Sequence, residues 1–382
     1  MPASTADLSL YLHFPWCVRK CPYCDFNSHA LHGEVPEDAY VDALLRDLDF
    51  ELAQAAETRA LTSIFMGGGT PSLFSGRAIG RVLEQTAKRL RFAPDIEITL
   101  EANPGTVDEA HFIEYRAAGV NRLSIGVQSL NAAHLKALGR IHDPLQARHA
   151  VDVARRAGFD NLNLDLMYAL PKQTLAEAEA DIREACALAP EHLSYYQLTL
   201  EPNTEFHARP PPLPDEDSAW AMQEQGQRIL AEHGYAQYEV SAYAQPHRRS
   251  RHNLNYWQFG DYLGVGAGAH GKLTCEGTIL RRAKQKHPKL YLDSAGTPAS
   301  LQEHKAIGAD DMPFEYTMNT LRLNEGFALA DFVQRTGQPA SVLQPALEKA
   351  RQRGLIEPGS EHIRPSVQGR AFLNDLIELF LP

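Results

Sequence analysis

Three cysteines, Cys17, Cys21 and Cys24, stand within eight residues at the spacing C-x3-C-x2-C. Thiolates are soft ligands that select zinc, copper(I) or iron–sulfur clusters. A structural zinc site usually takes four protein ligands, with a second C-x2-C pair elsewhere in the chain. The other two cysteines, Cys186 and Cys275, are isolated and distant. Three thiolates on one short loop can instead hold three corners of a four-iron cluster and leave the fourth iron open to a chelating ligand.

The alternative for the same cysteines is a zinc site completed by His13, His29 or His32. The chain has five cysteines, an odd number with three of them clustered, so a disulfide framework is not indicated. This cysteine usage indicates a reducing compartment, and we predict a cytoplasmic protein. The first residues have no basic start and no long apolar run, so we expect no signal peptide.

The composition excludes several classes of protein. The chain has 382 residues with 37 Lys and Arg against 48 Asp and Glu, a net charge of −11, so we expect no nucleic-acid partner. An apolar content of 44% is ordinary for a globular protein. No apolar run is long enough to span a bilayer, so membrane association is expected to be peripheral at most.

Strand-like apolar runs alternate with stretches of helical spacing through the first half of the chain. Such βα units build a parallel sheet, and six of them without a Rossmann glycine fingerprint favour a full or partial (β/α) TIM-like barrel. A helix over 215–232 and a further strand over 235–241 follow a proline-rich stretch. The predicted barrel strands are Leu8–Phe14, Thr62–Met66, Asp95–Leu100, Arg122–Val127, Asn161–Met167 and His192–Leu198.

Polar residues stand where these strands end, and the carboxyl ends of barrel strands carry the active site. They include Gly67–Thr70, Glu101, Gln128, Asp165 and Thr199. Glycines let a backbone approach a ligand, and a carboxylate can accept two hydrogen bonds from a ribose diol. Taken singly, the glycines can form an ordinary tight turn, and the carboxylates can cap helices or pair with arginines. Their common position next to the cysteine loop favours one shared cofactor.

A second group of chemically capable residues lies later in the chain. His252 stands close to Tyr256 and Trp257, and a glycine run that ends at His270 follows. Imidazole ligates haem iron, aromatic rings cover the macrocycle, and arginines pair with its propionates. For an arbitrary protein, a solvated basic face beside buried aromatics explains these residues equally well, because a second basic run extends over Arg281–Lys289.

The pattern of predicted elements changes near residue 300, from alternating strands and helices to mostly helices. Three helices, a hairpin over 354–365 and a last helix resemble a winged-helix domain, but residues 301–382 have 8 basic and 11 acidic side chains, which does not suit DNA. We predict an α/β chain with a barrel over 1–240, a barrel-closing segment over 241–300 and a small winged-helix-like domain over 301–382.

The cysteine spacing after a first strand, with Tyr23 before the last cysteine, resembles the radical S-adenosylmethionine (SAM) superfamily. The resemblance covers nearly the whole chain and is to the group that contains oxygen-independent coproporphyrinogen III oxidase (HemN) and the HemW haem chaperones. It implies a [4Fe-4S] cluster on Cys17, Cys21 and Cys24, with SAM on the open iron. The SAM-binding residues that it implies are Tyr11, Tyr23, Gly68, Gly69, Thr70, Glu101, Gln128, Arg140, Asp165, Thr199 and, as a looser match, Ala267.

Two features separate the oxidases from the chaperones. The oxidase motif has a fourth cysteine two residues after the third, whereas Asp25 and Phe26 follow Cys24 here. The segment 252–257 resembles the HNxxYW signature of the chaperones, which implies haem binding by His252, Asn253, Tyr256 and Trp257.

The resemblance therefore implies a chaperone that binds haem and delivers it to recipient haemoproteins of respiration. Oxidative decarboxylation of coproporphyrinogen III is the alternative, so whether the chain is an enzyme stays open. A different radical SAM reaction and a zinc-stabilised interaction protein are further alternatives.

Overall fold

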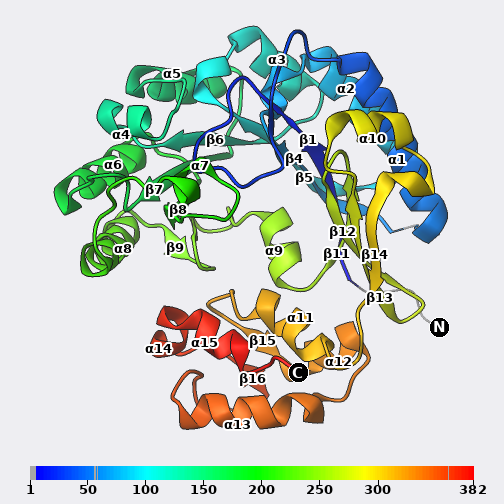
Figure 1. The fold of residues 1–382 in the computed structure, drawn as a ribbon, viewed down its shortest axis with the longest axis vertical. Helices are drawn as coiled ribbons and strands as arrows, with labels where there is room; N and C mark the ends of the chain where they lie inside the picture. The colour runs from blue at the N-terminus through cyan, green and yellow to red at the C-terminus, as the bar shows by residue number, and fades with distance from the viewer. Residues whose placement is uncertain (1–5, 56, 58, 360) are drawn as a thin grey trace.

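The computed structural model describes residues 6–55, 57, 59–359 and 361–382. Its main element is a curved twelve-stranded sheet whose seven central strands are all parallel (Figure 1). In spatial order these strands are β11 (Asp261–Val265), β1 (Leu8–Phe14), β4 (Leu61–Gly68), β5 (Phe92–Ala102), β6 (Arg122–Gln128), β7 (Leu162–Tyr168) and β8 (His192–Gln197).

The six predicted barrel strands are confirmed within a few residues at each end. The seventh parallel strand, β11, was not among them, and it pairs with the opposite side of β1 from β4. It overlaps the start of the glycine-rich stretch 262–270, where Gly264 inside the strand and Gly266 just after it weaken the strand signal. Residues 1–5 of the barrel domain predicted over 1–240 lie outside the described residues.

The sheet stays open, so the barrel is partial. Beyond β8, the antiparallel strands β10 (Ala242–Ala244) and β9 (Ala236–Gln237) form one edge. The single strand expected over 235–241 is therefore wrong, because the chain turns back on itself there. Beyond β11, the other edge consists of the antiparallel strands β12 (His270–Cys275), β13 (Thr278–Lys284) and β14 (Leu301–Ala306).

Alternate strand residues face the two sides of the sheet. In β1, Leu8, Leu10 and Leu12 are buried in the large apolar core. Helices cover this outer face (Figure 1). They are α1 (Glu37–Ala55), α2 (Gly76–Ala87), α3 (Glu109–Ala117), α4 (Ala132–Ala137), α5 (Pro144–Arg156), α6 (Leu175–Ala187), α8 (Glu216–Glu232) and α10 (Pro288–Ser294).

The opposite residues face the barrel interior and are largely polar. Ser9 and Ser63 are hydrogen-bonded at 2.7 Å between their hydroxyl oxygens. The interior is closed near the amino-terminal ends of the strands by the short helix α9 (Arg251–Trp257). Glu97 of β5 accepts hydrogen bonds from the backbone N–H groups of Arg251 and His252, at 3.0 and 3.2 Å, and so holds the start of α9.

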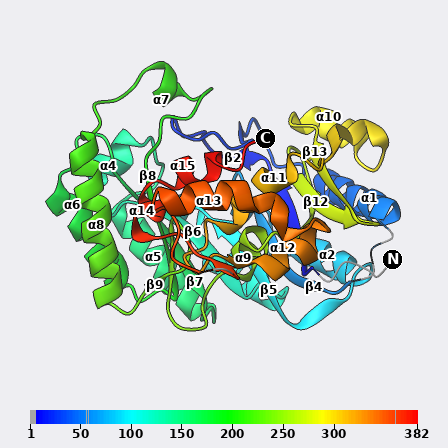
Figure 2. The same ribbon diagram turned by 90° about the horizontal axis from the view of Figure 1, so that it is seen from below.

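The C-terminal domain lies beneath α9 (Figures 1 and 2). Its apolar core continues into the barrel part through Phe259 and Ile279. The predicted hairpin is reduced to a bridge between Ile356 and Pro365, and its second arm pairs instead with a strand that was not predicted. The elements are α11 (Met312–Thr320), β15 (Phe327–Ala328), α12 (Leu329–Thr336), α13 (Gln344–Gln352), β16 (His362–Ile363), α14 (Val367–Ala371) and α15 (Leu373–Glu378).

Among the described residues, no helix has both the length and the apolar content that crossing a bilayer requires.

Candidate functional site

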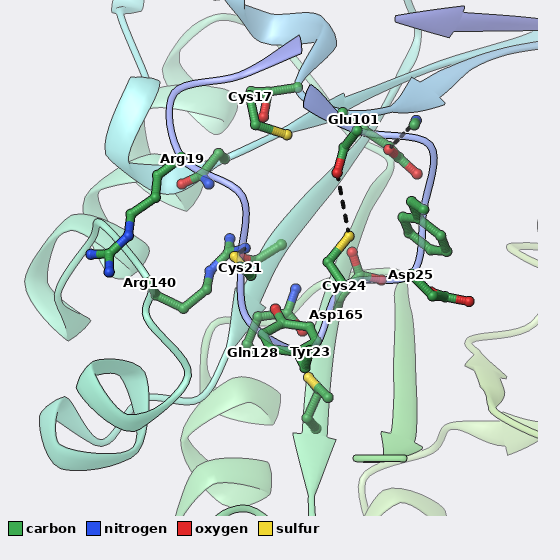
Figure 3. A pocket seen from close by; sticks show the side chains of 18 of the residues that line it. Cys17, Arg19, Cys21, Tyr23, Cys24, Asp25, Glu101, Gln128, Arg140 and Asp165 are labelled. Carbon is green, nitrogen blue, oxygen red and sulfur yellow. Dashed lines mark hydrogen bonds between the residues drawn. The ribbon is translucent and has the colours of Figure 1, made fainter. Parts of the chain in front are cut away.

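The three cysteines lie on one loop whose base is closed by backbone pairing. Cys17 ends β2 (Trp16–Cys17), which pairs in parallel with β3 (His29–Ala30). Leu31 N–H donates to the carbonyl of Cys17 at 2.8 Å, and within the loop Cys24 N–H donates to the carbonyl of Cys21 at 3.2 Å. All three side chains line one cavity of about 340 Å³ (Figure 3).

The donor groups near the cysteine loop bear on the choice between a cluster and a single metal ion. Among the described residues, no three His, Cys, Asp or Glu side chains converge enough to hold one ion. Zinc needs ligand atoms within about 2.0–2.3 Å of one point. The cysteines of a four-iron cluster bind separate irons, so their sulfurs stay apart. His13 is also committed elsewhere, because its Nδ1 bonds Tyr11 Oη at 3.0 Å and its Nε2 bonds the Asn27 carbonyl at 2.8 Å. The three thiols on one loop are compatible with three corners of an iron–sulfur cluster, and His13 is not available to complete a zinc site.

Two polar groups approach the thiol sulfurs. Arg140 Nη1 lies 3.6 Å from Cys21 Sγ, and Ser28 Oγ lies 3.6 Å from Cys24 Sγ. Burial raises the pKa of the Cys17 and Cys24 thiols, so these two are protonated at neutral pH until a metal displaces the proton. Donors at cluster sulfurs are one means by which a protein sets a reduction potential.

The carboxyl ends of the parallel strands supply the rest of this cavity. Figure 3 shows Glu101, Gln128, Arg140 and Asp165 arranged around the cysteine loop. The sequence-predicted residues that line the cavity with the cysteines are Tyr23, Gly68, Gly69, Thr70, Glu101, Gln128, Arg140, Asp165 and Thr199. Tyr11 and Ala267 do not line it.

The glycine turn after β4 is required by packing as well as by access to the cavity. Gly68 has φ +110°, and a Cβ there would lie 2.3 Å from the His13 ring. A Cβ on Gly69 would lie 2.5 Å from the Trp16 carbonyl oxygen. Thr70 N–H donates to that same carbonyl at 2.8 Å. The tight-turn reading and the ligand reading of these glycines are therefore compatible.

Glu101 and Asp165 form an acidic pair on the cavity wall. Burial, with a contribution from the nearby Asp165 charge, raises the pKa of Glu101 to about 8. Burial also raises the pKa of Asp165, against hydrogen bonds from Asn163 at 2.8 Å and Ser124 at 3.4 Å. Glu101 accepts a hydrogen bond from Gly68 N–H at 3.1 Å. Among the described residues neither carboxyl forms an ion pair, although the Arg122 charge acts on Asp165, so the two enclosed carboxyls favour a positively charged ligand.

We expect Glu101→Gln to stabilise the cluster-free protein at high pH. Between the ordinary Glu value of 4.5 and about 8, an unfolded chain releases the proton while the folded chain keeps it, so folding stability falls as pH rises. The free energy of unfolding should increase by about 1–2 kcal/mol at pH 8, with little change near about pH 5. Denaturant unfolding at both pH values measures this, with the exposed Glu224→Gln as control. An equal gain at both pH values would contradict the assigned shift.

Gln128 is held in a strained conformation that aims it at the cavity. Its φ is +69°, which non-glycine residues rarely adopt. Tyr196 Oη donates to Gln128 Oε1 at 2.8 Å, and Arg140 Nη2 donates to the Gly126 carbonyl at 2.7 Å. A Cβ on Gly126 would lie 3.1 Å from the Gln128 amide nitrogen. A side chain at residue 126 would crowd Gln128 and Arg140, which both pass over its backbone, so glycine fits this position.

A second cavity of about 560 Å³ adjoins the first. The two share Asp25, Phe26, Gly68 and Glu101 as walls. Tyr11 lines this second cavity, and so does Tyr256 of the predicted haem motif. A ligand in the second cavity would therefore lie directly beside a ligand in the first.

The other predicted haem residues line neither cavity. The buried His252 ring packs between Phe65 and Tyr256, with both ring centroids 4.9 Å away, and its Nδ1 lies 3.4 Å from Ser63 Oγ. Burial lowers the pKa of His252 to about 3, so its imidazole is neutral. Asn253 lies on the same helix, and Trp257 packs under the Arg322 guanidinium at 4.3 Å.

Ala267 is buried and acts through its backbone. Its carbonyl accepts a hydrogen bond from Asn27 Nδ2 at 2.9 Å, and its N–H donates to Tyr40 Oη at 3.0 Å. Asn27 also donates to the Lys286 carbonyl at 2.8 Å. This asparagine ties the cysteine loop to the chain 240 residues later, and no sequence pattern singled it out.

Buried ion pairs with α1 hold the segment 266–284, which contains Ala267. Lys284 Nζ contacts Asp47 Oδ1 and Glu51 Oε1, both at 2.5 Å, and Arg282 contacts Glu51 at 2.6 Å. Asp47 also accepts from Gly266 N–H at 3.2 Å. The reading of 281–289 as a solvated basic face is therefore wrong for Arg282 and Lys284, which are buried.

Comparison with known proteins identifies the family. Residues 11–185 match the Radical SAM superfamily, and residues 307–372 match the HemN C-terminal domain. The chain is 51% identical to the heme chaperone HemW of Escherichia coli (strain K12) and 49% identical to that of Haemophilus influenzae, over 98% of both chains in each case. The chain belongs to the HemW family of haem chaperones.

Membership of the HemW family confirms the family resemblance, and two further comparisons extend it. A mouse mitochondrial relative, radical S-adenosyl methionine domain-containing protein 1, is 39% identical over 100% of this chain and 88% of its own. The solved structure of the radical SAM enzyme coproporphyrinogen III oxidase (HemN) from E. coli superposes with a TM-score of 0.83 over 98% of this chain and 90% of that chain. At 24% identity that likeness shows the fold alone, and it confirms the predicted fold class.

Proposed function

We propose that this HemW-family chain binds a [4Fe-4S] cluster and SAM in the first cavity, binds haem beside them, and delivers the haem to recipient haemoproteins, including those of respiration. The observation that carries the proposal is the common wall of the two cavities. The first contains the three thiols, the second contains the motif tyrosine Tyr256, and Glu101 and Phe26 line both.

The first cavity suits SAM by charge and by shape. SAM carries a positive sulfonium, an amino and a carboxylate group, and the site offers the carboxyls of Glu101 and Asp165 with the cation Arg140. Cys17, Cys21 and Cys24 would hold the cluster, whose open iron supplies a chelation point and an electron when the cluster is bound. The strained Gln128 is fixed in place by Tyr196, so the wall is organised before any ligand arrives.

Chaperone work requires that haem be held and then released. The second cavity is open on one side, and its lining combines tyrosines, two histidines and two lysines. This lining suits a macrocycle that is apolar on its faces and anionic at one edge. Because the two cavities share a wall, we propose that SAM in the first cavity affects how haem is transferred from the second cavity to a recipient protein.

The proposal is tested by a transfer assay with the anaerobically reconstituted protein. We expect stoichiometric haemin binding, followed by transfer of haem to an apo-haemoprotein, apomyoglobin being a convenient probe. Adding SAM should change the transfer rate severalfold, because the two cavities share a wall. A haemin Soret band that neither shifts nor sharpens when the protein is added would contradict the proposal. Decarboxylation of coproporphyrinogen III at a useful rate under the same conditions would favour the oxidase function instead.

A further inference from the structure

A buried series of hydrogen bonds begins at Asp165, on the wall of the first cavity. Asn163 Nδ2 donates to Asp165 Oδ1 at 2.8 Å and to Ser124 Oγ, also at 2.8 Å. Asn163 Oδ1 lies 2.6 Å from His192 Nδ1 and accepts from Ser194 Oγ at 3.1 Å. Asn163 and His192 are 3% and 1% exposed, so water does not compete for these bonds. The carboxyl on the cavity wall is thereby linked to a buried imidazole.

The series continues from this imidazole to the start of α9. His192 Nε2 lies 2.9 Å from Tyr238 Oη, which accepts a hydrogen bond from the Ser250 N–H at 3.4 Å. Ser250 caps the amino terminus of α9, because its Oγ accepts from the Asn253 N–H at 3.3 Å. The first cavity is therefore connected to the helix that contains the HNxxYW motif. The residues of this polar network are Asp165, Asn163, His192, Tyr238 and Ser250.

The donors of the polar network all point toward the first cavity. The Asn163 amide nitrogen donates on the cavity side, so its oxygen is the acceptor and His192 Nδ1 carries the ring proton. His192 Nε2 then accepts from the Tyr238 hydroxyl. Burial and the Arg122 charge lower the pKa of His192 well below its ordinary value, which keeps the ring neutral and able to accept. Hydrogen bonds aligned in one direction polarise one another, so a change at Asp165 alters the bonds at the start of α9.

A cationic ligand in the first cavity acts on the end of this network. A positive charge against Asp165 weakens the attraction of its carboxyl for the Asn163 amide, and the bonds that follow weaken in turn. The start of α9 has a second anchor in Glu97, which accepts from the N–H groups of Arg251 and His252. Loss of one anchor therefore loosens the helix start without detaching the helix.

Resting on the proposed binding of SAM and haem, we propose that the polar network transmits SAM binding at Asp165 to α9 and so promotes the release of haem. His192 and Tyr238 are positioning residues in this coupling. Tyr256 of α9 lines the second cavity, so a shift of the helix changes the surface that faces a ligand there. The coupling is reciprocal, and bound haem weakens the binding of SAM by the same factor.

The test compares Tyr238→Phe with wild type in the anaerobically reconstituted full chain. Phenylalanine keeps the ring and removes the hydroxyl that joins His192 to Ser250. Deuterium exchange of the backbone amides over 250–257 is followed by mass spectrometry, and SAM binding is verified by electron paramagnetic resonance (EPR) of the reduced cluster. We expect SAM to speed this exchange about threefold in wild type. In Tyr238→Phe the exchange should be faster without SAM and unchanged when SAM is added.

Tyr235→Phe is the matched control, and haemin affinity is the second readout. Tyr235 is also a buried tyrosine, and its hydroxyl donates to the Pro190 carbonyl at 2.6 Å, outside the polar network. SAM should weaken haemin binding about threefold in wild type and in this control, and leave it unchanged in Tyr238→Phe. All three proteins should bind SAM alone with affinities within about twofold of one another, which loss of the fold would not allow.

Opposite outcomes separate this inference from the proposed function. If wild type binds both SAM and haemin but exchange over 250–257 does not respond to SAM, the coupling is overturned while the proposed function stands. An equal response in Tyr238→Phe and wild type would also overturn it. If wild type binds no SAM or no haemin, the proposed function and this inference fail together. The wild-type exchange measurement needs no variant, so a poorly folded variant would not prevent a decision.

Discussion

Replacing Cys21 by serine is expected to abolish the iron–sulfur cluster while leaving the fold intact. Cys21 stands on a loop that is closed independently by the pairing of β2 with β3, so the backbone does not depend on the thiol. Serine removes one of three thiolates, and the serine hydroxyl is a poor ligand for the softer iron–sulfur core. Iron and labile sulfide should fall to a small fraction of the wild-type content after anaerobic reconstitution.

Cys275→Ser provides the matched control for this experiment. Cys275 ends β12 and lines neither cavity, so its replacement should leave iron and sulfide unchanged. The thermal unfolding of both variants without iron should match that of wild type. Retention of full iron and sulfide by Cys21→Ser, or zinc without sulfide in the wild type, would contradict the cluster assignment and restore the zinc alternative.

Replacing Lys284 by methionine is expected to produce the largest loss of stability. Lys284 is 1% exposed and contacts Asp47 and Glu51, which are 0 and 2% exposed. Methionine keeps much of the volume but leaves two buried carboxylates with one fewer cation, which costs about 3–5 kcal/mol of unfolding free energy. Because Asp47 also binds Gly266, the Asn27 anchor of the cysteine loop should loosen, and cluster retention should fall as well.

Two further variants make the Lys284 result interpretable. Lys88→Met removes a lysine from an exposed pair with Glu84 and should leave the unfolding free energy close to that of wild type. The double variant Asp47→Asn with Lys284→Met removes one of the stranded charges and should recover part of the loss. Equal effects of Lys88→Met and Lys284→Met would show that the buried network does not stabilise the fold.

The sequence was sufficient for six of the seven parallel strands and for most residues of the first cavity, because their signals are encoded locally. The strand β1 has apolar residues at Leu8, Leu10 and Leu12, and the polar residues at strand ends follow from the rule that carboxyl ends meet at one face. Glu101 and Asp165 lie far apart in the chain, but the sheet brings them to one wall.

What could not be predicted depends on contacts between distant segments. Gly264 within β11 and Gly266 after it gave only a weak strand signal, so the seventh parallel strand was missed. The burial of Lys284 on β13 was missed as well. The HNxxYW motif does not show the orientation of α9. In the structure Tyr256 lines a cavity and His252 does not, which the motif alone could not predict. Asn27 looked like an ordinary loop residue, since its partners are Ala267 and Lys286.

Hyperfine spectroscopy with labelled SAM can show whether the three-thiol loop holds a cluster whose fourth iron is open to SAM. The reduced, reconstituted protein is mixed with SAM that carries a magnetic isotope at its amino nitrogen, and electron–nuclear double resonance is recorded. We expect a strong hyperfine coupling between the cluster and the labelled nitrogen. A cluster EPR signal that SAM leaves unchanged, with no coupling to the label, would contradict it.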